Sequence, residues 1–437
     1  MNPLATELNQ VVQAESPPIM EMLSSVGKQL FFPKGILSQG AEAKQKAHKL
    51  NATIGIATQA DDIMYFDSVM NSIKDIPARE SLTYAPSFGI PELRKAWKDS
   101  LYAKNPSLQD KPISLPVVTS GITHGISMFA DLWIDPDDVV ILPAMMWGNY
   151  NMIFSVRKGA RIRTYETFTS TGGYNIEALR EAVADEAKQN MKITVLLNFP
   201  HNPSGYTATD AEGDQIVSML TQAAQAGTHV MAVTDDSYFG LFYEPHVLHE
   251  SLFARLCGQD PKLLAVKLDG CTKENFVWGL RIGFITYGIA AANPAPLFDA
   301  LEKKTAGCIR GNISNASHLG QSIVLKSMQS EAYPLEKQEK FHILKQRAAT
   351  VKTVLADEKY QAAWEAFPFN SGYFMCIRLK TVAAEKLRVH LLNNYGVGLI
   401  SIGTDKLRVA FSCLEDSDIQ TLFDTILKGV EELQADS

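Results

Sequence analysis

Short apolar runs alternate with amphipathic stretches through the middle of the chain. Runs that favour buried strands lie at 116–119, 139–142, 161–165, 193–198, 229–234, 263–268 and 284–287. Apolar residues at helical spacing indicate helices between several of them, at 126–133, 176–189 and 210–226, and a further helix from Pro91. Apolar strands that alternate with helices predict an α/β fold with a mostly parallel central sheet, flanked by helices on both faces.

The pattern changes near residue 320. Three long charged helices are expected at 335–355, 382–394 and 417–433, around short strands at 373–379, 399–402 and 407–411. This arrangement predicts a smaller α+β domain. The first 50 residues are polar and helical in pattern, which indicates an arm packed on something else. We therefore predict an N-terminal arm with part of the small domain at 1–60, a large domain at 61–320 and a small C-terminal domain at 321–437.

Composition narrows the class of protein. Of 437 residues, 46% are hydrophobic and 20% are charged, as in an ordinary globular protein. The net charge of −7 comes without a basic run, which argues against a nucleic-acid partner. Five cysteines without a Cys-x-x-Cys pair fit a reducing, cytoplasmic setting, and no metal site is expected. The first basic residue is Lys28 and no apolar run approaches ~20 residues, so neither a signal peptide nor a membrane span is expected.

In a sheet of this kind, ligands collect beyond the carboxyl ends of the strands. After the first predicted strand, Gly121, Ile122 and Thr123 open a helix, so their amides and the helix dipole favour a phosphate; small residues there also serve as plain helix caps. Trp147 follows the second strand and is either a ring that stacks on a planar cofactor or a core residue. Asn202 lies in a segment that a simple turn would also explain.

Two further strand ends carry charged residues. Asp235 ends a buried strand, where a carboxylate is costly unless it meets a cation; no local cation is apparent, so a ligand cation is one explanation. Lys273 lies between two apolar runs, where loss of hydration lowers the pKa of an amine and makes it a nucleophile suited to a Schiff base. Arg281 adds a permanent cation. The alternative is a solvated loop lysine beside a structural arginine.

The order of these groups resembles that of the pyridoxal-phosphate enzymes of the aspartate aminotransferase family, the class I/II aminotransferases of fold type I. Three motifs carry the resemblance, which covers about residues 50 to 415: Asn202-Pro203-Ser204-Gly205, Asp235-x-x-Tyr238 and Lys273-x7-Arg281-x-Gly283. It implies the fold type I architecture, pyridoxal 5'-phosphate as cofactor, an α-amino acid and a 2-oxo acid as substrates, and a homodimer.

The resemblance also implies a role for each matching residue around the cofactor ring. Lys273 matches the lysine that holds the cofactor covalently and moves the substrate proton. Asp235 matches the partner of the pyridine nitrogen, which an ionised carboxylate keeps protonated. Asn202 and Tyr238 match hydrogen-bond donors to the ring oxygen, and Trp147 matches the ring on the pyridine face.

Further matches concern the phosphate. Gly121, Ile122 and Thr123 match its amide donors, Arg281 matches its arginine, and Tyr84 matches a tyrosine from the neighbouring subunit. One departure concerns the residue three positions before the lysine, which is often a serine in the family and is Gly270 here. Thr272 is the alternative source of a hydroxyl.

The remaining matches concern the substrate. Arg408 matches the arginine that binds the α-carboxylate in a bidentate fork, together with Asn202 and the backbone at Gly55. Arg310, in Ile309-Arg310-Gly311-Asn312-Ile313-Ser314-Asn315, matches an arginine that enters the neighbouring site and binds a distal carboxylate. Aspartate-like or glutamate-like substrates are therefore favoured; the alternative is a surface or interface arginine.

Three functions remain open at this point. The first is an aminotransferase that works by a ping-pong mechanism. The second is another fold type I enzyme, such as a carbon–sulfur β-lyase, because such enzymes share the residues nearest the cofactor. The third is a ligand-sensing module of a transcription regulator. The third reading requires a basic DNA-binding domain before residue 50, and the acidic start of this chain argues against it.

Overall fold

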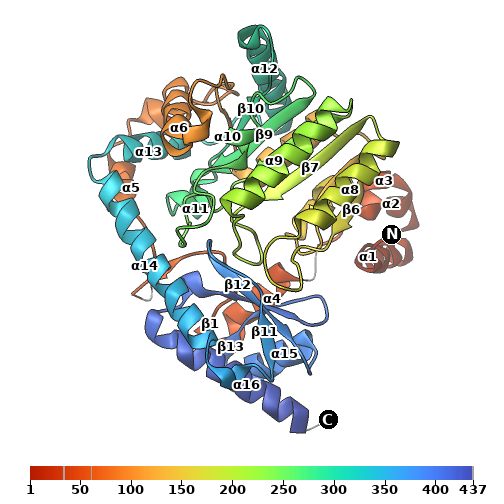
Figure 1. Cartoon of the computed structure of the whole chain (residues 1–437), viewed down its shortest axis with the longest axis vertical. Coiled ribbons are helices and arrows are strands. Elements are labelled where there is room, and N and C mark those ends of the chain that lie inside the picture. The colour runs from red at the N-terminus through yellow and green to blue at the C-terminus, as the bar shows by residue number, and fades with distance from the viewer. Residues whose placement is uncertain (33–34, 61, 436–437) are drawn as a thin grey trace.

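The computed structural model describes residues 1–32, 35–60 and 62–435. Within these residues the chain forms one seven-stranded and one four-stranded sheet, besides two short strand pairs. Figure 1 shows the two larger sheets one above the other, with the long helix α14 (Tyr333–Leu355) running from the first toward the second. The two sheets correspond to the predicted large and small domains. The boundaries drawn after residues 60 and 320 stay predictions, and residues 436–437 lie outside the described part.

The large sheet has the strand order β4-β10-β9-β8-β7-β5-β6. Its strands are β4 (Val117–Thr119), β5 (Val139–Pro143), β6 (Arg161–Tyr165), β7 (Lys192–Asn198), β8 (His229–Asp235), β9 (Leu263–Gly270) and β10 (Gly283–Gly288). The pairs among β5 to β9 are parallel, whereas β10 is antiparallel to both β4 and β9. The expected mostly parallel sheet is confirmed, and each predicted run corresponds to one of these strands.

Alternate strand residues pack into two different hydrophobic clusters, so both faces of the sheet are covered. In β5, Val139 and Ile141 belong to one cluster, and Val140 and Leu142 to the other. The first face carries α6 (Pro91–Lys104), α8 (Ile176–Gln189), α9 (Asp210–Gln225) and α10 (Leu252–Leu256); the second carries α7 (Ile122–Trp133), the π-helical η3 (Asn151–Arg157) and α12 (Pro294–Asn312). Burial of both faces explains the near-continuous apolar runs of the strands.

The small sheet has the order β11-β12-β15-β14 and is antiparallel throughout. Its strands are β11 (Trp364–Ala366), β12 (Phe374–Leu379), β14 (Ile400–Ile402) and β15 (Lys406–Ala410). Two helices of this part of the chain are α15 (Ala384–Tyr395) and α16 (Ile419–Ala435), and α14 leads into it. Two further helices lie earlier in the chain, α5 (Asp67–Lys74) and α13 (His318–Gln329). The predicted α+β domain is confirmed, although β11, which has three residues, gave too short a pattern to be recognised.

The N-terminal part begins with four helices, in agreement with its helical pattern. They are α1 (Pro3–Glu15), α2 (Pro17–Met22), α3 (Ser25–Gln29) and α4 (Ile36–Lys46), followed by β1 (Leu50–Asn51), β2 (Thr58–Gln59) and β3 (Asp62–Ile63). Figure 1 shows α1 to α3 beside the edge of the large sheet that carries β6. In contrast, α4 packs against β13 (Val397–Gly398), and β1 pairs in parallel with the same strand. The chain after β1 is thereby held next to the small sheet.

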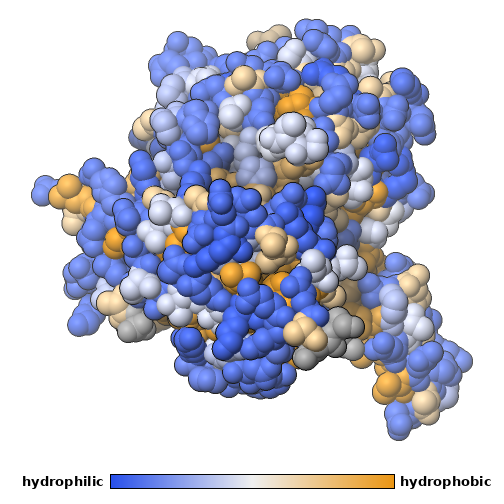
Figure 2. Space-filling view, turned by 60° about the horizontal axis from the view of Figure 1, so that its bottom comes forward, coloured by the Kyte–Doolittle hydropathy of each residue, from blue (hydrophilic) through white to orange (hydrophobic). Residues whose placement is uncertain are grey.

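The described helices bear on the expectation that the chain has no membrane span. Among the described residues, no helix combines the length and the apolar character that crossing a membrane requires. On the face that Figure 2 shows, hydrophilic side chains predominate, and hydrophobic ones form small separate groups.

Candidate active site

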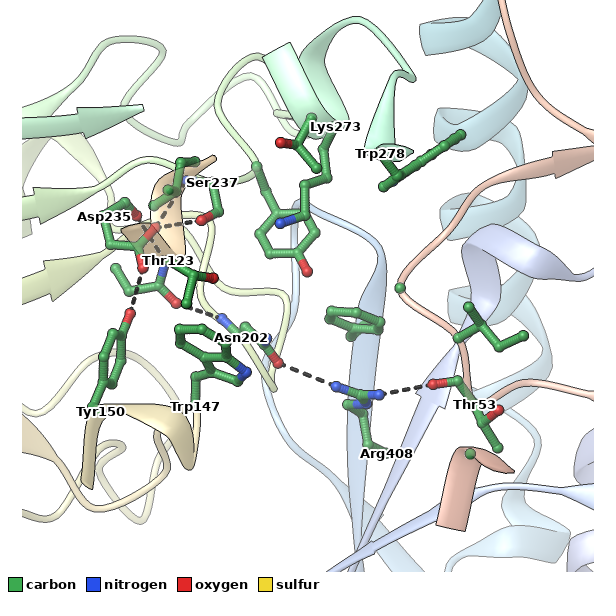
Figure 3. A pocket seen from close by; sticks show the side chains of 18 of the residues that line it. Thr53, Thr123, Trp147, Tyr150, Asn202, Asp235, Ser237, Lys273, Trp278 and Arg408 are labelled. Carbon is green, nitrogen blue, oxygen red and sulfur yellow. Dashed lines mark hydrogen bonds between the residues drawn. The ribbon is translucent and has the colours of Figure 1, made fainter. Parts of the chain in front are cut away.

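A cavity of about 480 Å³ lies where the carboxyl ends of the large-sheet strands face the small sheet. Figure 3 shows that its side chains come from both sheets and from the segment after β1. Most residues singled out in the sequence line it: Gly55, Ile122, Thr123, Trp147, Asn202, Asp235, Tyr238, Thr272, Lys273, Arg281 and Arg408. Residues that the sequence did not single out also line it, among them Lys44, Thr53, Tyr150, Asn198, Ser237 and Phe374.

Asp235, the last residue of β8, is 2% exposed. Its Oδ2 accepts a hydrogen bond from the Tyr150 hydroxyl at 2.6 Å, and its Oδ1 accepts bonds from the Ser237 amide at 3.1 Å and the Ser237 hydroxyl at 2.5 Å. Burial raises the pKa of the Asp235 carboxyl, while these donors and the charge of Lys273 oppose that change. The carboxylate is therefore held by neutral donors, and no cation within the described residues donates a hydrogen bond to it.

Lys273 lies in the short helix α11 (Cys271–Glu274), directly after β9, and is half-buried. Its Nζ is 4.8 Å from the centre of the Tyr238 ring. Burial lowers the pKa of Lys273 to about 8; Arg281 acts in the same direction and Asp235 acts against it. About a tenth of this amine is then neutral at pH 7, and the neutral form is the one that acts as a nucleophile. These surroundings differ from those of a solvated loop lysine.

Arg408 extends from β15 into the cavity and is 2% exposed. Its Nη2 donates to the Thr53 carbonyl at 2.9 Å and its Nη1 to Asn202 Oδ1 at 3.3 Å, while the guanidinium lies 4.1 Å from the centre of the Phe374 ring. Within the described chain its Nε has no hydrogen-bond partner, and no carboxylate pairs with it. A buried guanidinium without an anion is suited to a carboxylate ligand, which accepts from its fork of donors.

The start of α7 and Arg281 also line the cavity. Gly121 has a φ of +79°, and a Cβ placed on it would lie 2.4 Å from Arg281 Nη2, so the guanidinium packs directly on this backbone. Ile122 and Thr123, the first residues of α7, line the same space. Gly121 itself lies behind Arg281 and is absent from the cavity lining. Free amides at a helix start beside an arginine favour an anion such as a phosphate.

Gly270, the departure noted in the sequence, is explained by its surroundings. A Cβ at this position would lie 2.7 Å from the Ile282 carbonyl oxygen, because β9 and β10 approach closely there. A serine would require the strands to move apart. Thr272 lines the cavity and is the nearby hydroxyl on the same segment.

Asn198 connects two strand ends of the site, although the sequence gave no sign of it. Its side chain donates to the Asp235 carbonyl at 2.7 Å and accepts from the Asn202 amide at 2.8 Å. The turn that carries Asn202 is thereby fixed against the end of β8.

Tyr84 and Arg310 do not line the cavity of their own chain. Tyr84 is 92% exposed, and Arg310 lies exposed near the end of α12. Both were expected to serve a neighbouring subunit, and that expectation stays a prediction.

Comparisons with known proteins identify the family of this chain. The family model described as aminotransferase class I and II matches residues 47–426. An aspartate aminotransferase of Bacillus sp. (strain YM-2) is 25% identical over 271 residues, which make up 62% of this chain and 63% of that protein. A probable N-acetyl-LL-diaminopimelate aminotransferase of Bacillus subtilis (strain 168) is 24% identical, with 80% of this chain and 81% of that protein covered.

Solved structures show the same fold. The aminotransferase of Anaerococcus prevotii superposes with a TM-score of 0.80 at 23% identity, covering 91% of this chain and 96% of that one. The kynurenine aminotransferase of Pyrococcus horikoshii, in complex with PMP, gives 0.78 at 15% identity and covers 95% and 98%. The mostly parallel sheet, its helices and the small antiparallel domain are thus those of fold type I.

Proposed function

Because the chain belongs to the class I and II aminotransferases, we propose that it transfers the amino group of an α-amino acid to a 2-oxo acid with pyridoxal 5'-phosphate as cofactor. The observation that carries this proposal is the convergence of Lys273, Asp235 and Arg408 on one cavity. The first supplies an amine with a pKa of about 8, the second a buried carboxylate, and the third a buried guanidinium that pairs with no anion among the described residues.

The residues present fit this cofactor. The amides at the start of α7, with Arg281 packed on Gly121, suit its phosphate. Asp235 suits the ring nitrogen, because an ionised carboxylate stabilises a protonated nitrogen. Trp147 suits the ring face, and Asn202 and Tyr238, which line the same cavity, suit the ring oxygen. When bound, the cofactor supplies a conjugated ring that accepts the electrons released at the substrate Cα.

The chain's own residues would then divide the work. Arg408 binds the substrate α-carboxylate through its fork of donors, with Asn202 beside it, and so orients the Cα–H bond. Lys273 Nζ accepts the proton that leaves Cα and returns one later in the cycle, for which a pKa of about 8 is suitable. Release of the first product before the second substrate enters gives a ping-pong mechanism.

For the substrate, we favour dicarboxylic amino acids and 2-oxoglutarate. The support is Arg310, which is exposed and positioned in the sequence like an arginine that enters a neighbouring site. This assignment requires a homodimer with shared sites, as does the assignment of Tyr84 to the partner's phosphate. Within the same chain, Lys44 of α4 also lines the cavity, so it is the competing cation for a distal carboxylate.

A half-reaction tests the reaction type. Purified protein loaded with cofactor should lose its visible absorbance on addition of glutamate, form one equivalent of 2-oxoglutarate, and regain the absorbance with a 2-oxo acid. With cysteine as substrate instead, release of pyruvate, ammonia and sulfide would favour the β-lyase alternative. Absence of any amino-acid-dependent spectral change would contradict the proposed function.

Arg310→Ala and Lys44→Ala test the substrate assignment. Loss of one partner of a buried charge pair typically costs about 2–5 kcal/mol, which is roughly 30- to several-thousand-fold in kcat/KM. Arg310→Ala should lower kcat/KM for aspartate and glutamate by that much and spare alanine. A selective loss in Lys44→Ala instead would place the selecting cation on the same chain. A wild type that prefers neutral amino acids would contradict the dicarboxylate assignment.

A further inference from the structure

Tyr150 is a buried tyrosine with no assigned role, and its hydroxyl reaches Asp235, the carboxylate among the described residues that line the cavity. It immediately precedes η3 and is 2% exposed, within the hydrophobic cluster that contains α7. Its ring meets the Trp147 ring edge to face, at 5.4 Å and 88°. Its hydroxyl donates to Asp235 Oδ2 at 2.6 Å, a contact drawn in Figure 3. Packing thus fixes the ring, and the ring fixes the direction of the donor.

We propose that Tyr150 and Ser237 are positioning residues that clamp the two oxygens of Asp235 and hold this carboxylate as an acceptor for the ring nitrogen of the cofactor. This inference rests on the proposed function, from which it takes the cofactor. Tyr150 lies in the segment after β5, and the proposal gives it a role at Asp235, at the end of β8. In the sheet order, β8 lies two strands away from β5.

The hydrogen-bond geometry supports the clamp. An ionised carboxylate offers about four acceptor positions. Tyr150 takes one on Oδ2, and the amide and hydroxyl of Ser237 take two on Oδ1. One position on the cavity side is left for a ligand donor. Because all three contacts come from the protein, the direction of that last position is set before a ligand arrives.

The charges around Asp235 favour the same arrangement. The groups that face it are Tyr150, Ser237 and Tyr238, with Lys273 from α11; Asn198 from β7 donates to its main-chain carbonyl. Burial raises the pKa of the Tyr150 hydroxyl well above its ordinary value, so this group stays a donor at neutral pH. A donor that cannot ionise favours the ionised form of its acceptor.

The same short segment also presents Trp147 to the cavity. Only two residues lie between Trp147, the ring suited to the cofactor face, and Tyr150, whose hydroxyl orients the carboxylate, and the two rings are in contact. The packed pair of Trp147 and Tyr150 would therefore act on both the face and the nitrogen edge of a bound cofactor ring.

The test compares two ligands with the cofactor-free protein. One is pyridoxal 5'-phosphate, and the other is its analogue with carbon in place of the ring nitrogen; dissociation constants are measured by quenching of tryptophan fluorescence. A hydrogen bond to a charged group corresponds to roughly 10- to 100-fold in affinity. Tyr150→Phe should weaken the cofactor by about that factor, and the analogue by less than about threefold, since the analogue has no nitrogen for Asp235 to meet.

Tyr287→Phe is the matched control. Tyr287 belongs to the same hydrophobic cluster, is fully buried, and its hydroxyl bonds Thr305 Oγ1 at 2.7 Å away from the cavity. This variant should change neither dissociation constant, although it too removes a buried tyrosine hydroxyl. Ser237→Ala keeps the amide donor to Oδ1, so it should weaken the cofactor selectively but by a smaller factor than Tyr150→Phe.

Each outcome is decisive. Equal weakening of cofactor and analogue in Tyr150→Phe would overturn the clamp, because a merely structural role affects both ligands alike. If Tyr150→Phe does not fold, a Ser237→Ala variant without selectivity for the cofactor would overturn it. Unmodified protein that binds neither ligand would overturn the proposed function, and the clamp with it.

Discussion

Asp235 and Asp236 are neighbours in the chain, yet their carboxylates lie in two different surroundings. Asp235 faces the cavity and accepts from Tyr150 and Ser237. Asp236 is 3% exposed, forms an ion pair with Lys267 and accepts from the Ser251 hydroxyl at 2.6 Å. The alternation of an extended backbone separates them to opposite sides.

Lys273 and Glu274 repeat this contrast one strand away. Glu274 is 4% exposed and binds Lys104 at 2.7 Å and Lys337 at 2.5 Å. Nearby, Lys267 pairs with Asp236 and Asp269. We call these six residues the interior charge cluster: Lys104, Asp236, Lys267, Asp269, Glu274 and Lys337. Each acid of the cluster pairs with one of its lysines. In the cavity, Arg408 has no such partner among the described residues. Charges paired within the chain serve stability, and charges left unpaired are available to a ligand.

The largest expected effect separates the two lysines. Lys273→Ala should reduce transamination by at least ~10³-fold, because the general base and the covalent anchor are lost together, with little change in unfolding. Lys267→Met should instead affect stability: it should lower the free energy of unfolding by about 3–5 kcal/mol, because it leaves Asp236 buried without its cation. Steady-state rates and denaturant unfolding of both variants check this. Near-normal transamination by Lys273→Ala would contradict the site assignment.

The two aspartates should separate in the same way. Asp235→Asn should lower kcat/KM by at least ~30-fold while the protein stays folded, because a neutral amide no longer stabilises a protonated ring nitrogen. Asp236→Asn should mainly lower stability, by about 3 kcal/mol, since Lys267 loses its closest anion. Activity and unfolding midpoints are measured side by side. Equal losses of activity at both positions would show that the wrong aspartate is assigned to the cavity.

Acid should weaken the interior charge cluster. Burial by itself raises the pKa of Glu274, but Lys104 and Lys337 outweigh it and bring this pKa to about 2, below the ordinary 4.5. The stabilisation is therefore present above about pH 4.5 and is lost as the pH falls toward 2, with a total of about 3 kcal/mol. Urea unfolding of wild type and Glu274→Gln at pH 7 and pH 3 measures this. The difference between the two proteins should shrink at pH 3; an unchanged difference would argue against the ion pairs.

The smallest expected effect concerns the titration of Lys273. In cofactor-free protein, reductive methylation of Lys273 should reach half its maximal rate near pH 8, because burial lowers the pKa of this amine. Peptide mass spectrometry after short exposures gives the rate for each lysine. Arg281→Gln removes a cation that lowers this pKa and should move the midpoint upward by less than about one unit. A midpoint near 10.5 would mean that the cavity does not desolvate the amine.

Much of the fold followed from local patterns. Runs such as 193–198 and 229–234 predicted β7 and β8 because strands buried on both faces must be apolar along their whole length. The antiparallel direction of β10 could not be predicted, because an apolar run looks the same whether the strand pairs in parallel or antiparallel. Similarly, Asp235 and Lys273 were found because strand ends of a parallel sheet converge, so position along the chain reveals position in the site.

The sequence by itself determined the order of strands and helices along the chain and the residues at the strand ends, and the resemblance of these residues to a known family indicated the class of chemistry. Tertiary structure alone decided which other groups surround them. Tyr150 reads as one more apolar residue before a helix, and its partner Asp235 lies 85 positions later. Lys44 and Thr53 reach the cavity because β1 pairs with β13, more than 340 positions away. Contacts of this kind depend on packing between distant segments, and no local periodicity encodes them.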